Sequence, residues 1–455
     1  MSAQPITDHY RHHAQRRLPG HDQSWLRELR HAAWLDFEQN GFPDRRHEDW
    51  KYTPVNNITR TRYGQPEPAA VDAAWVRSFK LPDLDAHTLV FVDGHYQAAL
   101  SDTPPTGVTV VTPLAAALNP GPAQPTPAPI HTHLGRIATA PGSGFVALNT
   151  ALMRDGLYLH VPRGVVVAQP IVLLCLSTGA DAPAMTHLRH VIVLDDHAQA
   201  TVIECYRGND GTDTVTNAVT EIVLNANAAL QHHAVQEAGD RATHIHWISA
   251  SQARASRLGS HAVAFGGRLS RTDIQTRLNG EGAHVDMNGL YHLSGRAHCD
   301  FHTRIDHTVP HCTSNECYKG VLDGRSCGVF NGKVVVAPHA QKTDSRQKND
   351  NLLLSRHAEI NTKPELEIYA DDVKCAHGAT IGQIQPEALF YLRSRGLDEA
   401  GARALLVFAF ADDILQRIPD PPVRALLTAR LNALMHAAGI PQATPTPVHT
   451  NRMSD

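Results

Sequence analysis

The stretch that decides the fold is Gly282-Ala283-His284-Val285-Asp286, because the chain echoes it 14 residues later as Arg296-Ala297-His298-Cys299-Asp300. The dipeptide Gly-Arg recurs near twice that spacing, at 267/268, 295/296 and 324/325. A turn that recurs at a fixed period is typical of a solenoid, in which each coil pairs with the next and only the ends need caps. The repeat predicts a parallel β-helix. Because the repeat is degenerate, a large β-sandwich remains the alternative.

The rest of the region from 145 to 382 has the composition of a strand-rich body. Short apolar runs alternate with polar turns, and no helical period of any length interrupts them. Strands that alternate with helices, as in parallel α/β folds, are therefore not expected. The sequence predicts a mainly β protein whose parallel β-helix core covers residues 145–382. The clearest apolar runs are 157–161, 171–175, 190–194, 200–204, 218–224 and 262–265.

The region before the core, residues 1–118, is predicted to be helical or mixed. From 22 to 40 its apolar side chains recur at helical spacing, and Gly41 and Pro43 end the pattern. Five prolines then follow between 120 and 129. Because proline holds the chain near polyproline geometry and cannot pair in a central strand, a linker or exposed loop is expected over 119–144.

After the core, the helical period returns in three segments, 386–395, 398–418 and 421–438. These segments predict a C-terminal helical domain over residues 383–440. The remaining tail, 441–455, is rich in proline and small polar residues and is expected to be disordered.

Composition limits the classes of function. The chain has 455 residues, 42% of them hydrophobic, so it can bury a sizeable core. Its 41 basic and 45 acidic residues give a net charge of −4, which offers no general attraction to nucleic acid or to anionic lipid. No apolar run approaches the roughly 20 residues of a membrane helix, and residues 1–20 contain no signal-peptide core. A cytoplasmic protein is expected.

Cysteine and histidine usage agrees with a reducing compartment. The seven cysteines are odd in number, which favours free thiols over a disulfide framework. Histidine is frequent, with 30 residues. Most of these histidines are expected to be scattered over the surface.

The segment 371–380, Asp-Asp-Val-Lys-Cys-Ala-His-Gly-Ala-Thr, contains the strongest candidate site. The residues before it alternate in polarity, which predicts a strand, and side chains two apart in a strand share a face. Cys375 and His377 would therefore point the same way. Together they could hold iron, zinc or a nascent cluster, but such sites take four ligands. Something else must complete the site.

Other candidate motifs are weaker. Cys312 and Cys317 could begin a plant-type ferredoxin ligand set, but no third cysteine follows at position 320. These two cysteines and Cys327 are therefore expected to fill the β body. Gly332-Lys333 resembles the end of a phosphate-binding loop, but Val334 replaces the required Ser or Thr, so the chain is not itself a P-loop ATPase. The pair His244 and His246 shares a strand face without a carboxylate or third histidine nearby in the sequence, which favours a surface position.

Specific motifs make the chain similar to the SufD branch of the SufB/SufD family, the scaffold of the Suf iron–sulfur cluster assembly system. The resemblance covers roughly residues 48–417 and is densest from 300 to 411. The motifs are Glu-Asp-Trp-Lys-Tyr-Thr at 48–53, Asp-Gly-Arg-Ser-Cys-Gly-Val-Phe-Asn-Gly-Lys at 323–333, Pro-His-Ala-Gln-Lys-Thr-Asp at 338–344, Leu-Ser-Arg-His-Ala-Glu-Ile-Asn-Thr-Lys-Pro-Glu-Leu at 354–366, Cys-Ala-His-Gly-Ala-Thr at 375–380 and Leu-Phe-Tyr-Leu-Arg-Ser-Arg-Gly at 389–396.

The resemblance implies a right-handed parallel β-helix flanked by N-terminal and C-terminal helical regions. It also implies a scaffold rather than an enzyme. Such a subunit pairs edge to edge with a SufB-like paralogue, and a transient iron–sulfur cluster forms at that interface, using a cysteine of SufB and the histidine that matches His377. Cys375 matches a neighbouring family cysteine. The C-terminal helical domain would bind a SufC-type ABC ATPase, and a cysteine desulfurase would supply sulfur indirectly.

The sequence leaves several matters open, among them the cluster type, a role for reduced flavin, and whether isolated chains form homodimers. Two competing functions also remain. Parallel β-helices include carbohydrate-active enzymes, for which Glu365, Glu367, Asp371 and Asp372 would be the catalytic carboxylates. The lack of an export signal and an aromatic content of 6% oppose this interpretation. A purely structural scaffold without a ligand is the third alternative.

Overall fold

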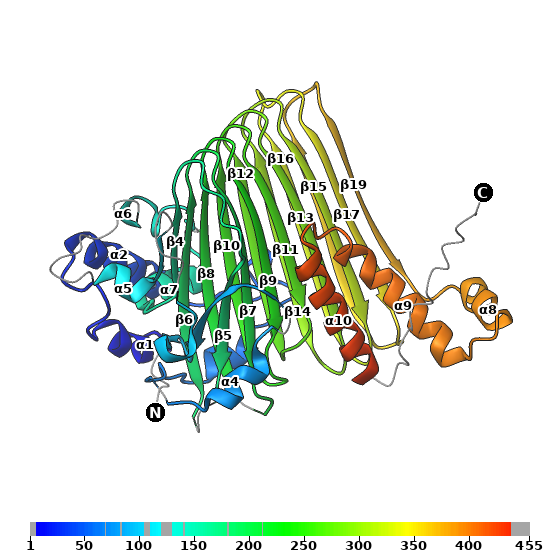
Figure 1. Cartoon of the computed structure of the whole chain (residues 1–455), viewed down its shortest axis with the longest axis horizontal. Coiled ribbons are helices and arrows are strands. Elements are labelled where there is room, and N and C mark those ends of the chain that lie inside the picture. Colours follow the sequence, from blue (N-terminus) through cyan, green and yellow to red (C-terminus); the bar gives the residue numbers. More distant parts are fainter. Residues whose placement is uncertain are drawn as a thin grey trace, which may run out of the picture.

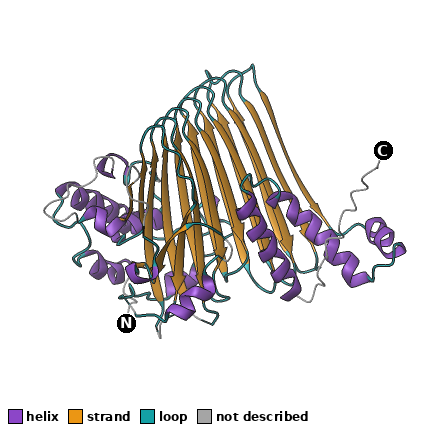
Figure 2. Cartoon of the chain, in the orientation of Figure 1, coloured by secondary structure: helices purple, strands orange, loops and turns teal. Residues whose placement is uncertain are grey.

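The computed structural model describes residues 6–68, 70–81, 84–103, 110–119, 130–139, 142–179, 182–211 and 213–437. Its body is a parallel β-solenoid built from two facing sheets, with helices at both ends (Figures 1 and 2). One sheet has ten strands in the order β19-β17-β15-β13-β11-β9-β7-β5-β1-β2, and the other has nine in the order β18-β16-β14-β12-β10-β8-β6-β4-β3. The predicted mainly β fold with a β-helix core is confirmed, and the sandwich alternative is wrong.

Consecutive strands of the solenoid alternate between the two sheets. The ten-stranded sheet contains β1 (His87–Val92), β2 (His95–Tyr96), β5 (Ile171–Ser177), β7 (Gln199–Gly208), β9 (Ala229–Glu237), β11 (Arg257–Ala264), β13 (His284–Leu293), β15 (Thr313–Leu322), β17 (Asp344–Leu353) and β19 (Lys374–Gly382). The nine-stranded sheet contains β3 (Val110–Pro113), β4 (Leu157–Val161), β6 (Ala184–Leu194), β8 (Thr214–Leu224), β10 (Thr243–Gln252), β12 (Leu269–Leu278), β14 (His298–His307), β16 (Cys327–Val336) and β18 (Glu359–Ile368).

The 14-residue echo in the sequence corresponds to half a turn of the coil. His284 begins β13 in one sheet, and His298 begins β14 in the facing sheet. Hydrogen-bonded neighbours are instead one full turn apart, so that His284 aligns with Thr313 and His298 with Cys327. The Gly-Arg dipeptide marks the turns that stack between coils. Gly295 and Gly324 both have positive φ, at 62° and 66°, and the amide of Arg325 donates to the Gly295 carbonyl over 2.7 Å.

The space between the sheets is filled mainly by inward-facing apolar side chains. Because side chains alternate along each strand, every second residue enters this interior, where it stacks on the aligned residue of the next coil. Leu173, Ile222, Ile274 and Val334 are typical members, all at most 1% exposed. This continuous stack is what stabilises the coil, since one coil alone could not bury its apolar face.

Helices gather around the N-terminal strands (Figure 1). They are α1 (Ile6–Ala14), α2 (Ser24–Asn40), α3 (Asn56–Arg60), α4 (Ala73–Phe79), α5 (Leu114–Leu118), α6 (Ile130–His133) and α7 (Gly144–Leu152), with the short 3-10 helices η1 (Glu48–Trp50) and η2 (Ala98–Leu100). The helix predicted over 22–40 is confirmed as α2. The core begins differently from the prediction, because 144–152 is a buried helix and strands β1 to β3 come from the N-terminal region.

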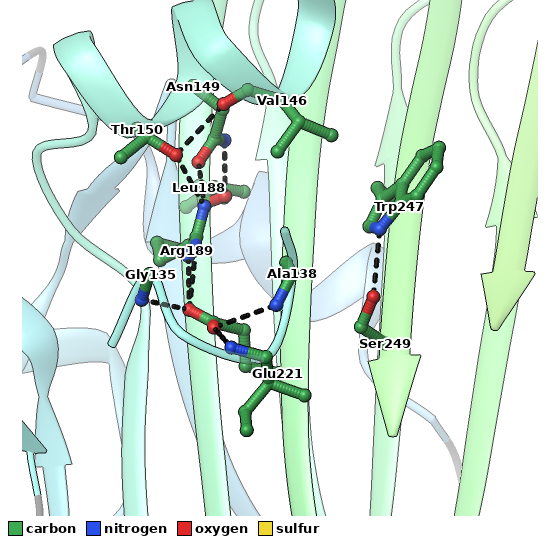
Figure 3. Close-up of polar contacts among 11 residues, drawn as sticks. Gly135, Ala138, Val146, Asn149, Thr150, Leu188, Arg189, Glu221, Trp247 and Ser249 are labelled. Carbon is green, nitrogen blue, oxygen red and sulfur yellow. Dashed lines mark hydrogen bonds and ion pairs between the residues drawn. The ribbon is translucent and has the colours of Figure 1, made fainter. Parts of the chain in front are cut away.

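A buried ion pair fastens this helical region to the nine-stranded sheet (Figure 3). Arg189 on β6 and Glu221 on β8 are both inaccessible, and Arg189 Nη2 donates to Glu221 Oε1 over 2.5 Å. The carboxylate of Glu221 also accepts hydrogen bonds from the backbone amides of Gly135 and Ala138, with N···O distances of 2.7 and 3.0 Å. Arg189 Nη1 donates to Asn149 on α7 over 3.2 Å. Each buried charge is therefore paired, as burial requires.

The C-terminal helices are α8 (Pro386–Ser394), α9 (Glu399–Leu415) and α10 (Pro421–Ala437), close to the predicted segments. In Figure 1, α9 and α10 lie across the outer face of the ten-stranded sheet. Val407, Ala411 and Ile414 of α9 belong to the same buried apolar cluster as Leu290 and Val321 of that sheet. The linker or loop predicted over 119–144 is described at 119, 130–139 and 142–144, where it contains α6 and the first residue of α7. Its proline-rich part, 120–129, and the predicted tail over 441–455 lie outside the described residues.

Candidate functional site

Cys375 and His377 lie on β19, the terminal strand of the ten-stranded sheet. Within the described part of the chain, β19 has no neighbour on its outer side, and the same holds for β18 in the facing sheet. The C-terminal end of the solenoid therefore presents two strands that, within this part of the chain, are paired on their inner edge and free on their outer edge. An unpaired strand offers a row of free amides and carbonyls to another chain.

The two candidate ligands share the inward face, as the strand phase predicted. Cys375 aligns with Ser345 of β17, and His377 aligns with Gln347. Ser345 and Gln347 are 1% and 3% exposed and point into the coil, so the residues stacked on them face the same interior. Cys375 is half-buried and packs against the apolar core, whereas His377 is exposed at the open end.

The electrostatics of this pair favour a neutral thiol. Burial, together with the carboxylate of Asp344, raises the pKa of Cys375 above its ordinary value. A metal would have to displace the thiol proton, because the thiolate is the ligand form. Among the residues that the structure describes, no group of three or more His, Cys, Asp and Glu side chains could by itself hold a metal ion. The pair at this end supplies at most half of a four-ligand site.

Beneath the open end, the inward faces of β15 and β17 carry buried polar side chains. Gln347 Nε2 donates to Glu316 Oε2 over 2.7 Å, and Ser314 Oγ donates to Ser345 Oγ over 2.8 Å. Burial raises the pKa of Glu316 to about 7. Nearby, the hydroxyl of Tyr291 and the side chains of Asn349, Asn351 and Thr362 form a second hydrogen-bonded group.

Family comparisons cover nearly the whole chain. Residues 175–410 match the family described as "SUF system FeS cluster assembly, SufBD core domain", and residues 1–173 match "SufBD protein N-terminal region". The chain belongs to the SufBD family.

Relatives of this SufBD protein are named after the same process. The iron-sulfur cluster assembly protein SufD of Escherichia coli is 34% identical over 400 residues, covering 86% of this chain and 89% of that protein. An iron-sulfur cluster assembly SufBD family protein of Synechocystis is 36% identical over 389 residues, covering 83% and 84%. SufD of Bacillus subtilis is 27% identical over 285 residues, covering 62% and 65%. The resemblance stated from the motifs is confirmed, and the chain is a SufD-like protein of iron–sulfur cluster assembly.

Two family motifs of this SufBD protein meet on the outer face of the nine-stranded sheet. The segment 48–53 crosses that face, where Arg271 of β12 lies 3.8 Å from the ring centre of Trp50. Thr53 Oγ1 donates to Asp300 Oδ2 of β14 over 2.5 Å, and Lys363 of β18 pairs with Glu48. These contacts reach β12, β14 and β18, which span four coils because β16 lies between β14 and β18, so the N-terminal motif fastens the coil.

The remaining cysteines of the SufBD protein agree with the sequence analysis. All seven cysteines are free. Cys312 and Cys317 are 0% and 4% exposed and fill apolar clusters, and Cys327 is half-buried. Burial raises the pKa of each of these three thiols, which keeps them unreactive.

The surface position expected for His244 and His246 is wrong. Both side chains are 1% exposed inside the solenoid, where His246 Nε2 lies 3.4 Å from Glu204 Oε2 of β7. Glu204 also pairs with His232 of β9 over 2.8 Å and accepts from the Tyr206 hydroxyl over 2.5 Å. The missing carboxylate and third histidine come from strands that are distant in the sequence.

This buried cluster also corrects the expectation that most histidines are scattered over the surface. Burial lowers the pKa of His246 to about 4, despite the opposing effect of Glu204. Burial alone would raise the pKa of Glu204, but His190, His246 and His232 bring it well below its ordinary value. A sequence signal existed, since His244 and His246 continue the alternating row of the apolar Ile248 and Ala250.

A groove of about 930 Å³ crosses the nine-stranded sheet and contains two of the carboxylates of the carbohydrate-enzyme alternative. Glu365 pairs with Lys363, and Glu367 pairs with Lys333, each over 2.5 Å. The hydrogen bond from Lys333 holds the pKa of Glu367 below its ordinary value. A general acid for glycoside cleavage needs a raised pKa. Glu367 is therefore not prepared for that role.

Two further features of the SufBD protein bear on its partners. Helix α8 contains no buried residue, and Phe390 and Tyr391 are 74% and 56% exposed. Figure 1 shows this helix standing clear of the solenoid. Within the described ranges, no helix combines the length and apolar character needed to cross a bilayer.

Proposed function

We propose that this chain is a scaffold subunit of an iron–sulfur assembly complex that also contains a SufB-like paralogue and a SufC-type ABC ATPase. In this proposal the nascent cluster forms between the paralogue and the open end of the solenoid, with His377 as a ligand or sulfur-transfer residue. The observation that carries it is the position of His377. This residue is exposed near Cys375 on a terminal strand whose outer edge is free among the described residues. Two ligands at a free edge need a second chain to complete them.

The open end is suited to pairing with another solenoid. Its free edges run along β18 and β19, which have ten and nine residues. The apolar side chains of Ile368, Tyr369 and Ile381 there are 39%, 63% and 53% exposed. Apolar side chains flanking a free strand edge mark an interaction site rather than a solvent face. A strand of the paralogue would continue the ladder there and bring its own ligands next to His377.

The C-terminal helices would bind the ATPase subunit. Because α9 and α10 bury their apolar side chains against the ten-stranded sheet, they have less apolar surface left for a partner. Helix α8 buries nothing, and its adjacent Phe390 and Tyr391 are largely exposed. Large exposed aromatic side chains of this kind are typical anchors at protein interfaces. We therefore place the ATPase contact on α8.

The test is anaerobic reconstitution of the complex with its paralogue, ATPase and cysteine desulfurase, followed by measurement of bound iron and sulfide. His377→Ala should leave assembly of the subunits intact and abolish cluster formation. Cys375→Ala should cause a smaller loss, because a cysteine beside a site can be a bystander. His31→Ala is the matched control, since His31 is an exposed histidine on α2 at the opposite end of the molecule.

The outcomes separate the three functions. Cluster formation that depends on His377 supports the proposal. Full cluster yield from the His377→Ala complex would contradict the assigned role of His377. A complex that binds neither iron nor sulfide under these conditions would favour the purely structural scaffold, and hydrolysis of a polysaccharide by the isolated chain would favour the enzyme.

A further inference from the structure

The amide of Gln347 lies directly beneath the exposed histidine of the open end. Gln347 and His377 are aligned partners of the β17–β19 ladder, and aligned residues of neighbouring strands lie about 4.8 Å apart. Both side chains face the interior of the coil. Gln347 is 3% exposed, and its Oε1 atom has no hydrogen-bond partner within the described residues.

Glu316 determines which end of this amide is available. It is aligned with Gln347 one coil further into the solenoid, and its Oε2 atom accepts from Gln347 Nε2 over 2.7 Å. An ionised carboxylate can only accept hydrogen bonds, so above pH about 7, the pKa of Glu316, the amide nitrogen must face Glu316. The carbonyl oxygen Oε1 is then the atom left for another donor, and a buried acceptor without a donor is costly.

The facing sheet makes room for this arrangement. A Cβ atom at Gly332 of β16 would lie 2.3 Å from Gln347 Nε2, closer than any real contact allows. A side chain at this position would force the amide of Gln347 to move, whereas glycine leaves it room. Gly332 therefore helps to place the amide of Gln347, although it lies on β16 in the facing sheet.

We infer that Gln347, held by Glu316, is a positioning residue that accepts a hydrogen bond from the imidazole of His377. One ring nitrogen of His377 would then donate to Gln347 Oε1, which leaves the other nitrogen as the lone-pair atom directed at the cluster site. The role given to this hydrogen bond rests on the proposed function of His377, whereas the bond itself would form between two residues of this chain and can be tested without a partner. Outer partners of this type fix the tautomer and orientation of histidine ligands.

The first experiment measures the tautomer ratio of the His377 imidazole ring in the full-length chain. The ¹⁵N shifts of labelled histidine report the tautomer, and the His377 signals are assigned by their loss in His377→Ala. Spectra are recorded at about pH 8, above the raised pKa of Glu316, which is about 7. Gln347→Met preserves the shape of the side chain and removes the acceptor. It should change the tautomer ratio of His377 about fivefold, the effect of one net hydrogen bond.

Ser345→Ala is the matched control. Ser345 is the other buried polar residue of β17 that lies under the candidate pair, but it is aligned with Cys375 rather than His377. This variant should leave the tautomer ratio of His377 unchanged. Equal ratios in the parent chain and in Gln347→Met would overturn the inference, and so would an equal change in Ser345→Ala.

The second experiment measures cluster yield in the reconstituted complex through a double-mutant cycle. Gln347→Met should lower the yield when His377 is present and have no further effect in the His377→Ala background. Independent losses in the two backgrounds would show that Gln347 does not act through His377. If His377→Ala alone keeps full yield, the proposed function fails, and the tautomer measurement still decides whether Gln347 orients the ring.

Discussion

The two ends of the solenoid are built from the same coil but finish in opposite ways. At the N-terminal end the last strands are antiparallel and short, with two residues in β2 and four in β3, and helices gather around them. At the C-terminal end β18 and β19 are parallel strands of ten and nine residues whose outer edges have no partner among the described residues. Short edge strands and covering helices prevent association, whereas long free edges invite it. The end on which we place the proposed site is the one without covering helices at its free strand edges among the described residues.

The buried polar groups inside the coil also differ between the two halves. In the N-terminal half, Glu204 and its histidines form a polar cluster that is fully enclosed. In the C-terminal half, the polar column of Glu316 and Gln347 leads to the exposed His377. The first group stabilises one buried arrangement, and the second connects the interior to a surface that a partner can reach. The predictions below separate these two roles.

The largest effect on stability is expected from Glu204→Ala in the enclosed cluster. The substitution leaves buried His232 and His246 without their hydrogen-bond acceptor, and each buried donor left unsatisfied costs about 1–3 kcal/mol, or about 2–6 kcal/mol for the two. The free energy of unfolding measured in urea should fall by that amount. A loss below about 1 kcal/mol would show that water or another group replaces the carboxylate.

A matched pair of proline substitutions tests the open edge. The amide of Lys374 donates to Thr343 within the chain, so alternate amides at 376, 378 and 380 also face β17, and those at 375, 377 and 379 face the free side. Ala376→Pro should therefore detach β19 and cost roughly 3 kcal/mol. Ala379→Pro should spare the fold and block pairing with the paralogue.

The readouts are unfolding of the isolated chain and co-purification with the paralogue. If Ala379→Pro still forms the heterodimer, the partner does not continue the β19 ladder. Comparing Ala376→Pro with Ala379→Pro thus separates the contribution of β19 to the fold from its contribution to the interface.

Stability should fall on mild acidification, chiefly because of the enclosed histidines. Burial lowers the pKa of His246, His261 and His307 to about 4 from an ordinary value of 6.5. The unfolded chain therefore binds protons first, and the stability present above pH 6.5 is lost as the pH falls toward about 4. His246→Gln should reduce this loss by up to about 3 kcal/mol. An unchanged pH dependence would show that His246 does not contribute.

The smallest effect on the chain itself is expected at α8. Phe390→Ala together with Tyr391→Ala removes only exposed side chains, so the free energy of unfolding should change by less than about 0.5 kcal/mol. Co-purification with the ATPase should be lost, while pairing with the paralogue persists. Leu35→Ala is a control, since Leu35 is 49% exposed on the distant helix α2. Retained ATPase binding would move the contact away from α8.

The sequence by itself determined the coil, the flanking helices and the candidate pair. The 14-residue echo, the Gly-Arg turns and the helical periods are local patterns, and local patterns determine which face of an element is apolar. The shared face of Cys375 and His377 follows from strand phase alone. The motifs also identified the family, which the comparisons confirm.

Only the tertiary structure decided which residues meet across coils. His244 and His246 looked like surface residues because Glu204 and His232 lie on other strands, and the alignment of strands one coil apart is what encloses them. The same stacking places Gln347 under His377 and Glu316 under Gln347, although 30 or 31 residues separate each pair. Spacing in the sequence identifies neighbours along one strand or helix. In a solenoid, the residues that bury a side chain or bond to it lie on the strands stacked next to its own, perpendicular to the strand direction.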